Sequence, residues 1–180
     1  MLTVASPPLF GTGTWHVDPA RSYLGFLIRH LRVATVRGRF GTFGGELTST
    51  GDGLRIAGRA LAASVDTGDR IRDDRLRTGF FQSDQHPLIE LGARCTEPLP
   101  GKEWILAGTL GIRGVVRPVV FRAIAEPVRD GGVRVVFSGA IKRSDFGLDW
   151  AALREAGRLL VADKVQVSAG LVLLPSEVEG

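Results

Sequence analysis

A histidine at the end of an alternating apolar run is the first feature of this chain that could bind a ligand. Residues two apart in a β-strand point to the same side. The residues that share one parity of the run are Ser22, Leu24, Phe26, Ile28 and His30. We therefore predict a sheet that curves around an apolar space, with one imidazole at its edge. His30 is either a ligand contact or a structural histidine that is hydrogen-bonded to the backbone.

An arginine-rich stretch supplies the second candidate. It contains Arg70, Arg72, Asp73, Asp74, Arg75 and Arg77. A guanidinium group offers a planar fork of donors that suits a phosphate, so this cluster could receive an acidic head group. The alternative is a solvated helix face with ion pairs within the helix.

Motifs of catalysis are missing from the sequence. It has no Gly-x-Ser-x-Gly elbow, no Gly-Lys-Ser/Thr phosphate loop and no His-Glu-x-x-His helix. His16, His30 and His86 lie on separate segments without the spacing of metal ligands, and Cys95 lies in an apolar run. We therefore predict no catalytic residue, no metal site and no cofactor.

Composition places the chain among globular proteins of one domain. It has 180 residues, 44% hydrophobic and 23% charged, with a net charge of +4. The positive charge favours acidic partners in general but is too diffuse to indicate nucleic acid. One cysteine excludes an intrachain disulfide, and no apolar run is long enough to span a membrane. Because residues 1–14 lack the features of a signal peptide, we expect a cytoplasmic protein.

Short apolar or alternating segments recur along the chain and are separated by turn residues. The expected strands cover residues 15–18, 23–30, 37–48, 54–65, 88–96, 103–112, 115–126, 133–143 and 165–174. Two short helices are expected at 69–77 and 151–160. This pattern excludes a βαβ sheet and leaves a sandwich or a barrel, and we favour a closed barrel because closure removes exposed strand edges. Gly38, Gly41, Gly44 and Gly45 then mark a strongly curved strand.

Several segments taken in order resemble the YceI-like family. They are Asp18 with Ser22, Phe26 and His30; Val36 to Phe40; Arg72 to Leu76 before Phe80 and Phe81; His86-Pro87; Gly108 to Val115; and Arg143 to Leu148. The resemblance spans about Trp15 to Leu174. It implies an all-β fold, an extended antiparallel lipocalin-like β-barrel of about eight strands with one or two short helices. It also implies an elongated pocket for a polyisoprenoid, such as a polyprenyl phosphate or an isoprenoid quinone.

Some positions depart from the family pattern. Arg21 and Arg75 stand where members of the family often have histidine, and Gly111 and Val116 stand where threonine is common. The two additional guanidiniums suit a phosphate better than a quinone ring. In the segment 143–148, we expect Arg143 and Asp145 to fix the end of a strand.

We therefore predict a non-catalytic protein that binds, sequesters or transports an amphiphilic isoprenoid lipid inside a barrel at 15–174, with an extension at 1–14 and a tail at 175–180. The predicted ligand-binding residues are Leu24, Phe26, Ile28, His30, Phe40, Arg75, Leu110, Ile112, Phe137, Ile141 and Val167. The expected partners are the lipid and, as an option, a second copy in a homodimer, with no nucleic acid.

Two alternatives remain open at this point. One is a barrel enzyme that acts on a small apolar substrate, with His30 and either Asp18 or Asp66 as an acid and base pair. The other is a barrel filled by its own side chains that serves as an interaction domain, because barrels of eight strands are just wide enough either to fill or to hold one ligand.

Overall fold

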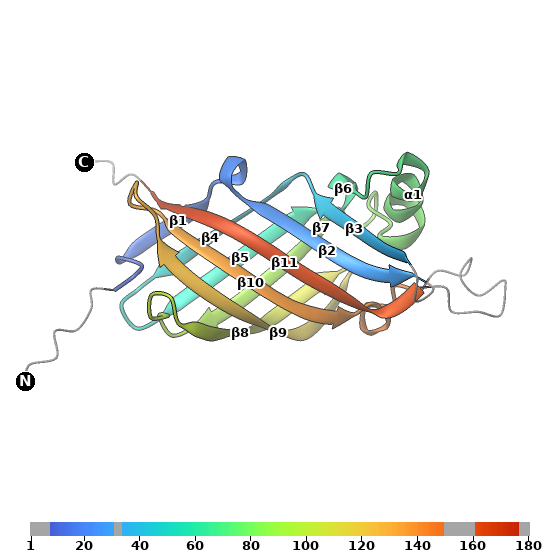
Figure 1. The fold of residues 1–180 in the computed structure, drawn as a ribbon. Helices are drawn as coiled ribbons and strands as arrows, with labels where there is room; N and C mark the ends of the chain where they lie inside the picture. Colours follow the sequence, from blue (N-terminus) through green and yellow to red (C-terminus); the bar gives the residue numbers. More distant parts are fainter. Residues whose placement is uncertain (1–7, 31–33, 150–160, 177–180) are drawn as a thin grey trace, which may run out of the picture.

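The chain forms a β-barrel with a short helix at one end (Figure 1). The computed structural model describes residues 8–30, 34–149 and 161–176. The strands are β1 (Gly13–Val17), β2 (Tyr23–His30), β3 (Ala34–Phe40), β4 (Phe43–Ser49), β5 (Leu54–Leu61), β6 (Val65–Asp66), β7 (Leu88–Cys95), β8 (Glu103–Ile112), β9 (Val115–Pro127), β10 (Val133–Lys142) and β11 (Val161–Pro175). Helix α1 is Arg70–Arg75.

The wall is a closed ring of antiparallel strands. Its order is β1-β4-β5-β7-β8-β9-β10-β11, and the pairing of β11 with β1 closes the ring. The predicted all-β, lipocalin-like barrel of about eight strands is therefore confirmed. Strands β2, β3 and β6 extend this sheet beyond the ring (Figure 1).

Strand β11 changes partner along one edge, and Ser22 marks the change. Residues 161–170 of β11 pair with β2, and residues 173–175 pair with β1. Between these stretches, the Ser22 hydroxyl accepts the Val172 N–H at 2.9 Å and donates to the Asp18 carbonyl at 2.6 Å. The Asp18 N–H donates to the Val172 carbonyl at 2.8 Å. The Asp18–Ser22 segment thus lets the chain bend without leaving β11 unpaired.

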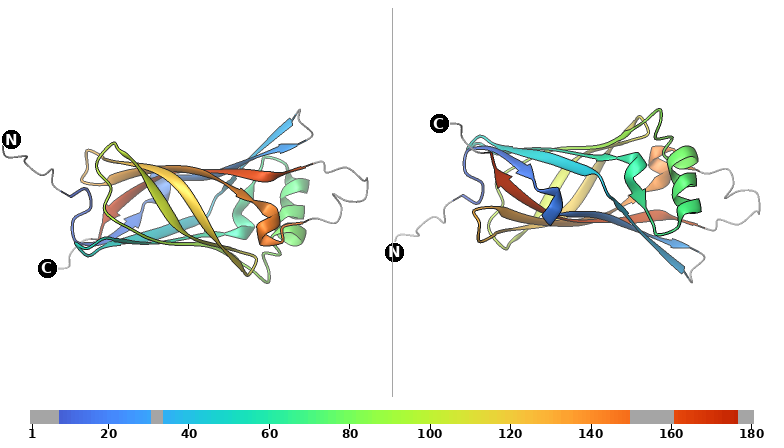
Figure 2. Two further views of the ribbon diagram at one scale, coloured as in Figure 1. Left: turned by 90° about the horizontal axis from the view of Figure 1, so that it is seen from below. Right: turned by 90° about the horizontal axis from the view of Figure 1, so that it is seen from above.

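The expected single strand at 37–48 is wrong, because two strands occupy this region. Strand β3 pairs with β2 and β6, whereas β4 pairs with β1 and β5. Gly41 lies between them, and its N–H donates to the Ser64 carbonyl at 3.0 Å. The sheet bends here, so the β2–β3 hairpin diverges from the barrel at the end where α1 lies (Figure 2).

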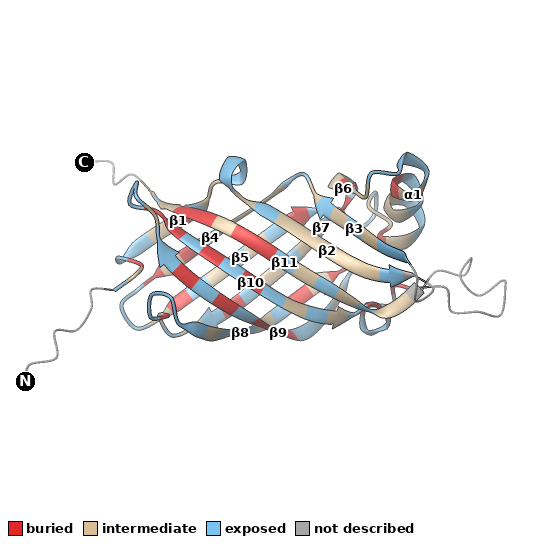
Figure 3. Cartoon of the chain, viewed as in Figure 1, coloured by how far each residue is buried: buried red, intermediate tan, exposed pale blue. Residues whose placement is uncertain are grey.

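Buried and exposed residues alternate along the strands of the ring, as expected for a wall with one face inside (Figure 3). In β9, for example, Val119, Phe121, Ala123 and Ala125 are buried, and the residues between them are exposed. Strands β2 and β3 differ, because the residues described there are half-buried or exposed. The hairpin is therefore the least covered part of the sheet.

Phe10 packs inside the end of the barrel at which β1 begins. Its side chain is almost fully buried, and its ring meets the Trp15 ring edge-on at 5.3 Å between centroids. The Phe10 N–H donates to Glu97 Oε1 at 2.6 Å, and the Ser49 hydroxyl donates to the Phe10 carbonyl at 3.4 Å. These contacts close this end.

The opposite end is covered by short segments that the β8–β9 turn holds together. Arg113 and Gly114 both have positive φ, +51° and +74°, as a tight hairpin turn of two residues requires. The Arg113 guanidinium donates to the carbonyls of Phe80 and Gly147 at 3.4 and 3.3 Å. A Cβ at Gly114 would lie 3.2 Å from the His86 ring, so the His86-Pro87 segment packs closely on this turn.

Helix α1 is shorter than the helix expected at 69–77. Asp69 caps its start by accepting the Arg72 N–H at 3.0 Å, and the chain continues from Leu76 to Phe80 as a π-helical turn. The buried Asp73 carboxylate accepts the N–H of Thr67 at 2.9 Å and also its hydroxyl. The expected helix at 151–160 lies outside the described residues. Within the described parts, no helix is long and apolar enough to cross a membrane.

Replacing Phe10 with alanine should lower the free energy of unfolding by about 3–5 kcal/mol, because a fully buried aromatic side chain is lost. Urea denaturation followed by circular dichroism measures this change. Leu99→Ala is the control at the β7–β8 connection, where the side chain is 66% exposed, and should stay within about 0.5 kcal/mol of wild type. A Phe10→Ala protein as stable as this control would show that Phe10 does not close the barrel.

Candidate functional site

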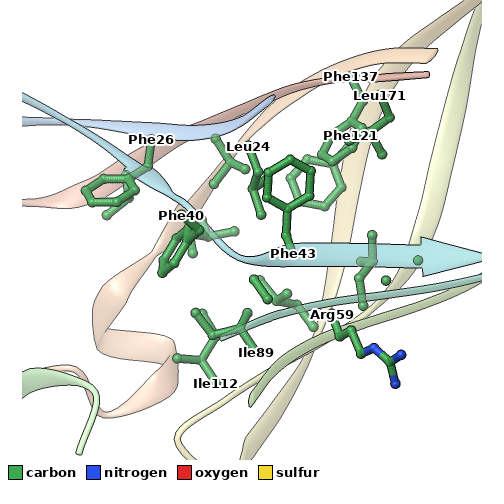
Figure 4. Close-up of a pocket in the computed structure, with 18 of the residues that line it drawn as sticks. Leu24, Phe26, Phe40, Phe43, Arg59, Ile89, Ile112, Phe121, Phe137 and Leu171 are labelled. Carbon is green, nitrogen blue, oxygen red and sulfur yellow. The ribbon is translucent and has the colours of Figure 1, made fainter. Parts of the chain in front are cut away.

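The barrel encloses an apolar cavity with a volume of about 580 Å³. This volume is within the range of about 300–1,000 Å³ typical of small-molecule pockets. The aromatic and aliphatic side chains that line it come from strands all round the wall (Figure 4). The interior is therefore hollow, and the alternative of a barrel filled by its own side chains is not what the structure shows.

The sequence-predicted residues converge on this cavity. Those that line it are Leu24, Phe26, Ile28, Phe40, Arg75, Leu110, Ile112, Phe137, Ile141 and Val167. Their convergence follows from the alternation of the strands, because the inward parity of each strand meets the same space. That these side chains contact a ligand stays a prediction.

The fold does not place the backbone positions of the acid and base pair considered for an enzyme close to one another. His30 ends β2 opposite Val161 and Ala34, and its side chain lies outside the described parts. Asp18 precedes the other end of β2 and accepts from Ala20 and Arg21. Asp66 pairs with Arg39. Arg39 lies five residues along β3 from Ala34, the partner of His30, and this separates the two positions by roughly 17 Å. Neither carboxylate lines the cavity.

A row of aromatic rings crosses the end of the cavity near α1. Centroid distances are 5.7 Å from Phe26 to Phe40, 5.9 Å from Phe40 to Phe81 and 5.1 Å from Phe81 to Phe80. The Phe26 ring lies directly over Gly38, because a Cβ at Gly38 would be 2.2 Å from that ring. Gly38 therefore makes room for an aromatic side chain rather than for a bend alone.

Two glycines on neighbouring strands leave a bare patch on the inner wall. Gly45 and Gly58 are paired across β4 and β5, and both line the cavity. A Cβ at Gly58 would touch only the Leu91 Cβ, at 3.6 Å, and would point toward the interior. Most strands contribute a side chain to the inner wall, so the cavity is wider where Gly45 and Gly58 contribute none.

Sequence reasoning missed part of the lining. The missed apolar residues include Val17, Val36, Phe43, Ile71, Ile89, Leu91, Trp104, Leu106, Phe121, Val135 and Leu171. Most have the same inward parity as the residues that were predicted, so the alternation in β7, β9 and β10 could have found them. Ile71 could not be found in this way, because it lies on α1. Among the described residues, the buried Nε1 of Trp104 has no hydrogen-bond acceptor.

The mouth of the cavity lies between the β2–β3 hairpin and α1, and we define it by Ile28, Val36, Ile71, Arg72 and Arg75. Ile71 is 68% exposed although it also lines the cavity, so the apolar wall continues to the surface here. Two guanidiniums, those of Arg72 and Arg75, thus lie at this opening, with the Asp69 carboxylate 4.0 Å from Arg72.

The arginine cluster of residues 70–77 divides into different roles. The Arg72 Nε donates to the Thr67 hydroxyl at 2.8 Å, and Arg77 donates to the carbonyls of Ala63 and Val65 at 2.8 and 2.9 Å. Arg77 also pairs with Asp74 at 3.0 Å. Arg77 is therefore structural. Arg72 and Arg75 line the cavity, and Arg72 is also held by Thr67, whose carbonyl accepts from it at 3.1 Å.

Carboxylates beside the mouth are held in their charged form. The Gly68 N–H and then the Arg39 guanidinium lower the pKa of Asp66, and the Arg72 N–H lowers the pKa of Asp69. These bonds stabilise the segment at pH values above the ordinary carboxyl pKa, and the stabilisation is lost as the pH falls through the lowered values.

Arg143 is a buried cation at the same end of the cavity. It lines the cavity, and its guanidinium donates to the carbonyls of Ala162 and Leu148 and to Asp149 at 2.9 Å. As expected, Arg143 fixes the end of a strand. Asp145 does not share this role: it is exposed, and the Asp163 carboxylate accepts from Ser144 instead.

Cys95 and the histidines do not form a reactive or metal-binding site in the described part of the chain. Burial raises the pKa of the Cys95 thiol to about 11, so the thiol stays protonated near neutral pH. No group of three or more His, Cys, Asp or Glu residues that could hold a metal ion occurs among the residues described.

Comparison with known proteins agrees with the fold. The model of the YceI-like domain matches residues 15–173. A UPF0312 protein of Staphylococcus aureus strain MSSA476 is 27% identical, over 89% of this chain and 96% of its own length.

Solved structures are similar as well. BcnA of Burkholderia cenocepacia has a TM-score of 0.76 at 22% identity, covering 87% of this chain and 98% of its own. A polyisoprenoid binding domain from Saccharophagus degradans has a TM-score of 0.76 at 17% identity, covering 89% and 98%. Because the domain match extends over nearly the whole barrel, this chain belongs to the family of proteins with a YceI-like domain.

Proposed function

We propose that this protein binds and carries an amphiphilic isoprenoid lipid, with the apolar tail in the barrel and the polar head at the mouth. The observation that carries the proposal is the hollow apolar cavity, lined from all sides by the inward residues of the strands. The likeness to a polyisoprenoid binding domain in another organism supports the same class of ligand.

The size of the cavity is suited to a short or medium tail. If a cavity of roughly 150 Å³ takes one benzene ring, about 580 Å³ has room for about four six-carbon units, or four to five isoprene units. Burial of about twenty carbons gains about 16 kcal/mol at 0.8 kcal/mol per CH₂, while association costs an estimated 4–15 kcal/mol. Contacts to the head group then add affinity and orientation.

The charge at the mouth favours a phosphate-bearing head over a quinone. Arg72 and Arg75 lie beside the apolar lining, and guanidinium groups donate to phosphate oxygens through paired hydrogen bonds. A neutral quinone ring offers only carbonyl acceptors and gains less from such a site. We therefore infer a polyprenyl phosphate as the preferred ligand and a non-catalytic carrier role.

The first test is uptake of lipid. Purified protein stripped of lipid should quench or shift its tryptophan fluorescence when a polyprenyl phosphate is added, because Trp104 lines the cavity. Phe26→Arg should abolish this uptake, because an unpaired charge would then lie in apolar surroundings.

Tyr23→Arg is the matched control, since Tyr23 lies on the same strand but is 54% exposed on the outer face. Circular dichroism must show that both variants are folded. A wild-type protein that takes up neither polyprenyl phosphate nor quinone, and from which solvent extraction recovers no prenyl lipid, would refute the carrier function.

Filling the bare patch gives a second prediction. Gly58→Leu should keep or raise thermal stability, because the Cβ of the new side chain has few neighbours and the rest enters apolar space. The same side chain occupies part of the cavity, so the longest prenyl tail that binds should become shorter. Gly92→Leu places the same side chain on the outer face of the neighbouring strand and should leave tail length unchanged. Titration with prenyl phosphates of increasing length distinguishes the two.

Removing a guanidinium from the mouth tests the head group. Arg75→Ala should weaken binding of a polyprenyl phosphate about tenfold, which corresponds to about 1.4 kcal/mol, and should change quinone binding less. Arg70→Ala is the control, because Arg70 is exposed on the same helix and does not line the cavity. Equal losses for both ligands would remove Arg75 from the head-group site.

A further inference from the structure

The mouth of the cavity combines exposed apolar and basic side chains in a way that the binding of a single lipid does not require. Ile71 projects from α1 and is 68% exposed, while Ile28 and Val36 are half-buried on the inner face of the hairpin opposite. Figure 2 shows the hairpin and α1 at the same end of the barrel, diverging from each other. The apolar lining thus reaches solvent at the rim.

The outer face of the hairpin is strongly basic. Strands β2 and β3 carry Arg29, Arg37 and Arg39 and no acidic residue, and all three arginines are exposed. Arg39 pairs with Asp66 at 2.9 Å, which ties the base of the hairpin to β6. On the facing helix, Arg70 and Arg75 are also exposed. Asp69 and Asp74 are exposed beside them, so most of the net positive charge at the apolar rim lies on the hairpin.

We propose that this end of the barrel docks on the surface of an anionic lipid bilayer, with Ile71 inserted at the interface and the arginines against lipid phosphates. The proposal rests on the proposed lipid-carrying function and adds the surface at which the ligand enters or leaves. An apolar patch ringed by basic side chains is the pattern of proteins that lie on membranes. Each basic residue near an anionic surface contributes independently to such binding.

A bilayer fits this surface better than an acidic protein does, because of what the cavity holds. A prenyl tail enters water only at a cost that grows with each carbon, so transfer is favoured where the cavity opens directly onto lipid. At the mouth, the apolar lining reaches solvent through Ile71 of α1, and the exposed arginines of the hairpin lie at the same end of the barrel. A partner protein would need to provide its own apolar path for the tail.

The test uses the full chain with vesicles of phosphatidylcholine alone or mixed equally with phosphatidylglycerol. Wild-type protein should sediment with the mixed vesicles but not with phosphatidylcholine alone, and high salt should release it. The double variant Arg29→Glu with Arg37→Glu should bind the mixed vesicles at least about fivefold more weakly for each arginine replaced. Neither residue lines the cavity, so uptake of polyprenyl phosphate from detergent should be unchanged.

Arg55→Glu with Arg94→Glu is the matched control. These residues are exposed partners on β5 and β7, near the end closed by Phe10, and the variant has the same net charge as the hairpin variant. If both variants lose vesicle binding equally, net charge explains the effect and the docking surface is refuted. Equal binding of wild type to both kinds of vesicle, or to neither, also refutes it. Failure of detergent uptake in wild type would instead refute the proposed function itself.

Discussion

The hydrogen bonding of β11 on both of its edges is the constraint on which the rest of the structure depends. One edge pairs with β10 over residues 164–173, and the other pairs first with β2 and then with β1. Because the ring is closed, the wall satisfies its own backbone groups and leaves no edge between its strands. The Ser22 hydroxyl preserves this closure at the point where the partner changes. The wall can then remain intact around a space that its side chains do not fill.

Packing at its two ends closes the hollow barrel. Phe10 and Trp15 pack at one end, and at the other the Arg113 guanidinium joins the turns that carry Phe80 and Gly147. Between the ends, the inner wall has residues with apolar side chains and also the bare pair Gly45 and Gly58. Buried residues such as Leu106, Phe121 and Phe137 both line the cavity and belong to the hydrophobic core, so the wall contributes to stability as well as to the cavity.

The bend at Gly41 connects the architecture to the proposed function. Because β3 separates from the ring there, its inner face remains open to the cavity while its outer face carries arginines. Helix α1 brings Ile71, Arg72 and Arg75 to the opposite side of the same opening. An apolar interior, a polar rim and an apolar residue at the surface therefore follow from one interruption of the sheet. In a fully regular barrel, these features would be separate.

Local pattern was enough to predict the barrel and much of its lining. Alternation is a property of each strand alone, so Leu24, Phe26 and Ile28 could be assigned to the inside before any neighbour was known. Local pattern did not predict the break between β3 and β4, the short length of α1 or the orphaned Trp104 nitrogen. Nor could it reveal that the interior is hollow, that Gly58 lies beside Gly45, or that Arg72 and Arg75 line the same cavity as the hairpin. These depend on the register between strands distant in sequence, because the cavity is the volume left when the whole wall has closed.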